Sequence, residues 1–149
     1  MYKSIITVAM TAGLFAAPAF ATEDDRAEWL FAHTADAVEI QEGNVLIVPM
    51  EREIFAFTDR PNRAHQYLNA HEFVALWNDG EDSFENDPPN AVLTWVADGE
   101  VHEAEIELVD VAIVDHGRAL VYGIDSESAI ALPIDASQVS LFIDGAYTL

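Results

Sequence analysis

Acidic and apolar residues alternate without a break over residues 103–108. A period of two residues is typical of a β-strand with one face in the core and the other in solvent. We therefore expect Ala104, Ile106 and Leu108 to face inward. From Val109 onward the apolar positions shift by one residue, and a β-bulge near Asp110 would keep the apolar side on the core. The pattern predicts a long, bulged and half-buried strand.

Short apolar runs of the same kind recur along the chain, and turn sequences separate them. The runs cover residues 38–40, 45–48, 54–57, 91–96, 120–124, 130–134 and 139–143. The first three are close enough in sequence to form a meander of antiparallel strands. Asp98-Gly99 is a typical hairpin turn, and Pro133 favours an edge position for its run. Together they predict an all-β fold, an antiparallel sandwich or flattened barrel.

The periodicity changes to that of a helix after Arg63. Asn69 is a favourable N-cap, and Glu72 stands three residues later, as a capping box requires. Phe73, Leu76 and Trp77 then follow at the spacing of one helix face. These residues predict one short helix at about residues 69–79, with Gly80 as its stop.

The first 21 residues have the organisation of a secretory signal. Lys3 is followed by a mostly apolar segment, residues 5–15, and by the small-x-small sequence Ala19-Phe20-Ala21. We expect cleavage to leave one domain, residues 22–149, with no membrane anchor and a periplasmic or secreted location in a bacterium. The chain contains no cysteine, which excludes a lipid-bearing thiol and a disulfide framework.

The expected mature chain is strongly acidic. It has five arginines, no lysine and all 27 Asp and Glu residues, so its formal net charge is −22. Such a charge argues against nucleic acid and anionic membrane surfaces as partners, because both require basic patches. The acids are spread along the chain, which favours solubility over specific cation capture.

Basic residues are concentrated in one turn, residues 57–63, where Arg60 and Arg63 flank Pro61 and Asn62. Their guanidinium groups are suited to bind a carboxylate or phosphate ligand. The alternative is a structural clamp, in which Arg60 pairs with Asp87 of the following acidic loop and Asn90 bonds the backbone near Asp59. The candidate binding residues are Asp59, Arg60, Asn62, Arg63, Trp77, Asp87 and Asn90. Trp77 is either a ligand-stacking ring or, as the helical spacing favours, a core residue.

The loop at residues 79–90 could offer carboxylate oxygens to calcium through Asp79, Glu81, Asp82 and Asp87. The spacing is not that of an EF-hand, and a solvated acidic loop is the preferred interpretation. We expect no other cofactor. The sequence contains no Gly-rich phosphate loop, nucleophile elbow or His-Glu-x-x-His motif.

Several segments resemble a family of small exported bacterial proteins of uncharacterised function. They are Phe57-Thr58-Asp59-Arg60-Pro61-x-Arg63, Trp77-x-x-Gly80-x-Asp82-Ser83-Phe84, Asp87-Pro88-Pro89-Asn90-Ala91 and Ser140-Leu141-Phe142-Ile143-Asp144. The resemblance implies a shared fold and export, and it transfers no catalytic residue. We expect an exported soluble binding or accessory module for an unknown ligand or protein. The alternative is a hydrolase or metal-dependent enzyme that uses the 57–63 turn and the 79–90 loop.

Overall fold

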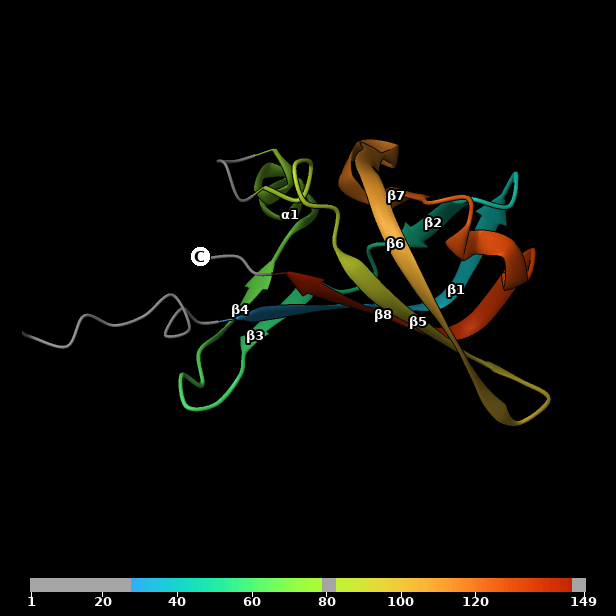
Figure 1. Cartoon of the computed structure of the whole chain (residues 1–149), viewed down its shortest axis with the longest axis horizontal. Coiled ribbons are helices and arrows are strands. Elements are labelled where there is room, and N and C mark those ends of the chain that lie inside the picture. The colour runs from blue at the N-terminus through green and yellow to red at the C-terminus, as the bar shows by residue number, and fades with distance from the viewer. Residues whose placement is uncertain (1–27, 79–82, 146–149) are drawn as a thin grey trace, which may run out of the picture.

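The computed structural model describes residues 28–78 and 83–145, which form one antiparallel sheet of eight strands and a short α-helix (Figure 1). The strands are β1 (Trp29–Gln41), β2 (Val45–Pro49), β3 (Ile54–Thr58), β4 (His65–Leu68), β5 (Asn90–Ala97), β6 (Glu100–Val114), β7 (Ala119–Ile124) and β8 (Asp135–Gly145). The helix is α1 (Ala70–Trp77), and the 3-10 turns η2 (Asp115–Gly117) and η3 (Ser128–Ala131) precede and follow β7. The expected all-β class with one helix is confirmed. The predicted signal segment, residues 1–21, lies outside the described residues.

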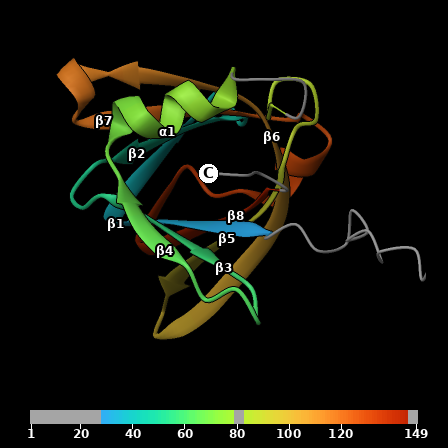
Figure 2. The same ribbon diagram turned by 90° about the vertical axis from the view of Figure 1, so that its left-hand side faces the viewer.

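Strand β1 closes the sheet into a flattened barrel because it pairs with three other strands along its two edges. One edge pairs with β8 from Trp29 to Glu39. The other edge pairs with β3 near Trp29 and with β2 near Gln41. Through β2, β7, β6, β5 and β8 the sheet returns to β1, so six strands form a ring. The β3–β4 hairpin extends the sheet from this ring (Figure 2).

A bend in β1 allows one strand to serve both neighbours. Alternate residues from Trp29 to Ala35 face the core, then Asp36 and Ala37 are both exposed, and Val38 is buried again. The inward face therefore changes phase by one residue at this point. The bend is held from outside, because the Asp36 amide donates a hydrogen bond to Glu51 Oε2 at 2.9 Å.

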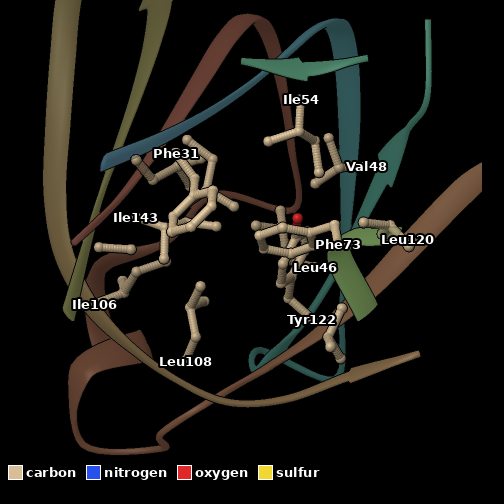
Figure 3. Close-up of a cluster of buried hydrophobic side chains, with 14 of the residues drawn as sticks. Phe31, Leu46, Val48, Ile54, Phe73, Ile106, Leu108, Leu120, Tyr122 and Ile143 are labelled. Atoms are coloured by element: carbon tan, nitrogen blue, oxygen red, sulfur yellow. The ribbon is translucent and has the colours of Figure 1, made fainter. Parts of the chain in front are cut away.

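The interior of the ring is filled by aliphatic and aromatic side chains from the strands and from α1 (Figure 3). The largest fully buried side chains are Tyr122, Phe31, Phe73, Leu46, Ile54, Leu93, Leu108, Leu120, Ile124, Leu141, Ile143 and His33. Helix α1 adds Phe73, whose ring packs edge-on against Phe31 at 5.6 Å between centroids. The helix therefore completes the core that the strands leave open on one side.

The local signals that begin α1 act as predicted. The Glu72 amide donates to Asn69 Oδ1, and the Asn69 amide donates to Glu72 Oε2, each at 2.9 Å. This reciprocal pair confirms the capping box and satisfies two backbone donors at the start of the helix. The helix ends at Trp77, and the predicted stop at Gly80 lies outside the described residues.

The predicted irregularities of β6 are also confirmed. Its register with β7 shifts between Leu108 and Asp110, where the phase of the apolar residues changes. At its other end, Asp98 and Gly99 take φ values of 53° and 77° in the turn that joins β5 to β6. Both residues therefore adopt the left-handed conformation that a tight hairpin requires.

Two expectations about the strands were wrong, and one strand was missed. The meander does not form, because β2 and β3 both pair with β1 and not with each other. Strand β4 was not predicted. The run at residues 130–134 is not an edge strand, since η3 begins at Ser128 and its hydroxyl donates to the Asp125 carbonyl at 2.9 Å. A side chain that bonds nearby backbone favours such a turn over a sheet ladder.

The loop that follows α1 is anchored by Phe84. Phe84 is buried, and its ring lies edge-on to those of Phe31 and Trp77 at 5.8 and 5.3 Å between centroids. Gly145 at the end of β8 lies directly beneath this ring, and a Cβ atom there would collide with it. Among the described residues, no helix is long and apolar enough to span a membrane.

Candidate functional site

Aromatic side chains gather on the outer face of the β3–β4 hairpin. The register places Phe55 opposite Tyr67 and Phe57 opposite His65. The Phe55 ring lies 5.4 Å from that of Phe57, 5.2 Å from that of Tyr67 and 6.0 Å from that of His65, measured between centroids. Tyr67 is 60% exposed although it belongs to a sheet. We call these four residues the aromatic cluster.

The same outer face continues as an apolar surface across β1 and β8. Leu30 is the neighbour of Phe57 on one side and of Asp144 on the other. Two residues further along β1, Ala32 lies between Phe55 of β3 and Phe142 of β8. Phe142 is 42% exposed, so the apolar surface is only partly covered. An exposed apolar surface that crosses several strands is typical of an interaction site.

Beyond β8 this surface deepens into a groove with a volume of about 530 Å³. Leu30, Val92 and Phe142 contribute to its apolar lining, together with the buried Ala91 and Ile106. Carboxylates line the same groove, with Glu105 and Glu107 on β6 and Asp144 on β8. We call this feature the outer groove. It combines an apolar surface with concentrated negative charge.

A smaller hollow of about 250 Å³ adjoins the outer groove and shares Asn90 and Asp144 with it. Glu28 and Asp87 add two more acidic residues to its lining. Of the predicted binding residues, Asp87 and Asn90 therefore lie at one site. Asn90 begins β5, where it pairs with Glu107 and Asp144 across the sheet. The expectation that Asn90 bonds the backbone near Asp59 was wrong.

The turn residues Asp59, Arg60, Asn62 and Arg63 lie at the tip of the β3–β4 hairpin, and all four are exposed. The Asp59 amide donates to the Glu28 carbonyl at 3.3 Å, which ties the tip to the start of β1. Thr58 Oγ1 accepts a hydrogen bond from the Ala64 amide at 2.8 Å and closes the turn. The tip is thus a structured element that carries two exposed guanidinium groups.

The predicted clamp between Arg60 and Asp87 does not form. Neither Arg60 nor Arg63 makes an ion pair with a carboxylate of the described residues, whereas Arg118 Nη2 lies 2.9 Å from Asp115 Oδ1. The hairpin tip projects away from the loop that carries Asp87 (Figures 1 and 2). Strand β4 carries the chain away from the tip before α1 begins.

Trp77 is a core residue and is not available to stack on a ligand. Its side chain is 2% exposed and packs on Phe84. This observation confirms the packing alternative and removes Trp77 from the candidate binding residues.

Of the candidate calcium ligands, Asp79, Glu81 and Asp82 lie outside the described residues. Asp87 is described and exposed, and lines the small hollow. Within residues 28–78 and 83–145, no group of three His, Asp or Glu side chains is arranged to hold a metal ion.

His33 is a buried polar residue that was not singled out from the sequence. It lies on β1 and is 1% exposed, with its ring tilted toward that of Tyr122. Nε2 lies 3.1 Å from the Pro49 carbonyl oxygen, which can only accept, so Nε2 carries the proton. Nδ1 therefore accepts a hydrogen bond from the Tyr122 hydroxyl at 2.9 Å. The alternation of Trp29, Phe31, His33 and Ala35 was the signal that could have placed His33 in the core.

Burial decides the protonation of this pair. Desolvation lowers the pKa of His33 to about 4, against the opposing effect of the hydrogen bond to Pro49. Desolvation also raises the pKa of Tyr122 well above its usual range. Both groups are neutral at neutral pH, and they satisfy each other inside the core.

Comparison with known proteins adds no assignment: no family model, no curated protein and no solved structure matches this chain.

Proposed function

We propose that the mature chain is an exported, soluble binding module that holds a cationic amphiphilic ligand in the outer groove. The observation that supports this proposal is the composition of the groove. Apolar side chains of Leu30, Val92 and Phe142 line the same 530 Å³ as the carboxylates of Glu105, Glu107 and Asp144.

An apolar lining favours the hydrocarbon or aromatic part of a ligand, because burying it removes apolar surface from water. The three carboxylates favour a positive group on the same ligand. The net charge of −22 acts in the same direction over a longer range, since it raises the local concentration of cations and repels anions. The acidity of the chain thus favours cationic over anionic ligands, in addition to keeping the protein soluble.

The proposal is tested with two probes of equal chain length and opposite charge, dodecylammonium and dodecanoate, each below its micelle concentration. NMR titration of labelled protein is expected to show shifts at Leu30, Val92 and Phe142, and at least about tenfold tighter binding of the cation. Equal affinity for the two probes, or shifts that avoid the groove, would overturn the proposal.

Matched variants separate the groove from the general surface. Phe142→Ser removes the exposed apolar lining and Glu105→Gln with Glu107→Gln removes two charges, and both are expected to weaken binding of dodecylammonium. The controls are Val101→Ser and Glu100→Gln, which change an exposed apolar side chain and an exposed acid at the β5–β6 turn. An equal loss in the controls would show that the probe binds without using the groove.

A further inference from the structure

The sheet ends at β4, which pairs with β3 and with no other described strand. Strand β4 has the sequence His65-Gln66-Tyr67-Leu68, with no Lys, Asp, Glu or Pro. Natural sheets commonly protect such an edge with charge, proline or a covering element. The edge of β4 carries none of these residue types, and Tyr67 beside it is 60% exposed.

The hydrogen bonds of the hairpin determine which peptide groups face the free edge. The Thr58 amide donates to the Ala64 carbonyl at 3.0 Å, so Ala64 directs its backbone toward β3. In an antiparallel ladder this orientation alternates. Gln66 and Leu68 therefore also face β3, while His65 and Tyr67 direct their N–H and C=O groups away from it. The free edge offers two donors and two acceptors in a row.

We propose that this edge binds a second copy of the chain by antiparallel pairing of β4 with β4 of the partner. A two-fold axis between Gln66 and the partner's Gln66 places His65 opposite the partner's Tyr67. Both residues of that pair have outward peptide groups, so the two symmetric pairs form four backbone hydrogen bonds. No other register of this short strand uses all the outward groups of both copies.

The side chains are also self-complementary in this register. Tyr67 and His65 both lie on the outer face, so each Tyr67 ring comes beside the partner's His65 ring, and cross-strand aromatic pairs stabilise antiparallel sheets. On the opposite face of the strand, the Gln66 amide meets the partner's Gln66 amide, and each can both donate and accept. The two aromatic clusters become one continuous surface.

Charge favours this meeting point over the rest of the molecule. The hairpin at residues 54–68 contains Arg60, Arg63 and a single acid, Asp59. Its formal charge is therefore positive, whereas the mature chain as a whole has a formal net charge of −22. Two strongly acidic bodies approach each other with least repulsion through these hairpins. Past the paired strands, the same register carries Arg63 toward the partner's Asn69 and Glu72. Arg63 has no ion pair with a described carboxylate, and Glu72 is exposed.

The proposal predicts a concentration-dependent dimer of the full mature chain. Sedimentation equilibrium from about 1 µM to about 100 µM is expected to show monomer and dimer in exchange. Over the same range, hydrogen exchange followed by NMR is expected to slow at the amides of His65 and Tyr67, because these groups have no backbone partner among the described residues of the monomer. A monomer at every concentration overturns the proposal, as does a dimer whose His65 and Tyr67 amides exchange at the monomer rate.

Variants test the register. Tyr67→Lys places a charge beside the edge and removes an aromatic contact, and it is expected to weaken the dimer at least about tenfold. Its control is Val101→Lys, an exposed apolar position on another hairpin. Circular dichroism of both variants checks that the monomer remains folded. An equal effect of the two changes overturns the assignment of the interface to β4.

Charge reversal provides a second readout. Glu72→Arg also removes the carboxylate that accepts a hydrogen bond from the Asn69 amide at the start of α1, so circular dichroism first checks that each variant remains folded. Arg63→Glu and Glu72→Arg are each expected to weaken the dimer, and the double variant is expected to recover most of the loss, because it restores the attraction with the signs exchanged. The control is Arg52→Glu in the exposed β2–β3 turn. Additive losses in the double variant overturn the antiparallel register. A different protein that binds the β4 edge of a purely monomeric chain also overturns the self-association.

Discussion

The Tyr122 hydroxyl lies 2.9 Å from His33 Nδ1, and both side chains are buried inside the ring of strands. The pair joins β1 to β7, which do not neighbour each other in the sheet. A hydrogen bond between two side chains in the core adds a directional contact to otherwise non-directional packing. Burial widens the pH range over which both groups stay neutral, because it lowers the pKa of His33 and raises that of Tyr122.

The stability of the protein is expected to fall as the pH drops from about 6.5 to about 4. The pKa of His33 is about 4 in the folded chain against 6.5 when unfolded, so the unfolded state binds the proton first. The stabilisation is complete above the unfolded pKa and is lost as the pH falls through the folded pKa. The loss attributable to His33 is about 2 kcal/mol at pH 5.

Urea unfolding of the natural chain and of His33→Gln at about pH 7.5 and pH 5 measures this contribution. Carboxylates titrate in both proteins, so their effect cancels in the difference between the two. A difference that does not change with pH would show that His33 titrates normally in the folded state.

Tyr122→Phe is expected to cost about 1 to 3 kcal/mol of the free energy of unfolding, because it leaves His33 Nδ1 buried without a donor. The aromatic ring and its packing remain in this variant, so the lost stability measures the contribution of the hydroxyl group alone. The matched control is Tyr67→Phe, in which the same atom is removed from an exposed ring. Losses of the same size in both variants would contradict the role of the buried hydrogen bond.

Trp77→Ala is expected to cost about 3 to 5 kcal/mol, as for other buried aromatic residues replaced by alanine. Trp77 is 2% exposed and supports Phe84, which covers the end of β8. Trp95→Ala on β5 is the comparison, because Trp95 is half-buried and stacks on exposed His102. Chemical denaturation that finds Trp95 the more costly position would contradict the described core.

Added salt is expected to raise the melting temperature between low ionic strength and about 0.5 M sodium chloride. The charge of −22 produces self-repulsion in the compact state, and salt screens it as the Debye length falls to a few ångströms. Thermal scans in sodium chloride and in calcium chloride at equal ionic strength separate screening from specific binding. A flat or falling melting temperature in sodium chloride would show that self-repulsion is not significant.

The features that the sequence predicted are those encoded by neighbouring residues. The capping box of Asn69 and Glu72, the bulge near Asp110 and the Asp98-Gly99 turn depend on local chemistry, and all three are present. The alternating strands predicted the fold class for the same reason. Each of these patterns reports which residues face the core, whatever the order of the strands.

The features that were missed depend on contacts between distant segments. β4 has only four residues, and its single buried apolar side chain, Leu68, gives no period to detect. The bend at Asp36 separates the part of β1 that pairs with β3 from the part that pairs with β2 along the same edge, and no local motif records that division. The outer groove was missed because Leu30, Val92 and Phe142 each appear in sequence as ordinary members of alternating strands.

A ribosome makes β1 first among the strands and β8 last, yet the two are neighbours over most of their length, with Trp29 opposite Gly145. A nascent chain that ends before Asp135 lacks β8, the strand that lies between β1 and β5. The ring therefore cannot close before β8 has been made, and non-local pairing of this kind is expected to make folding slow, on a scale of about milliseconds to seconds. Strand β1 is made first, and one of its edges stays unpaired until β8 is available. The eleven residues of β8 therefore determine when the barrel can reach its native structure.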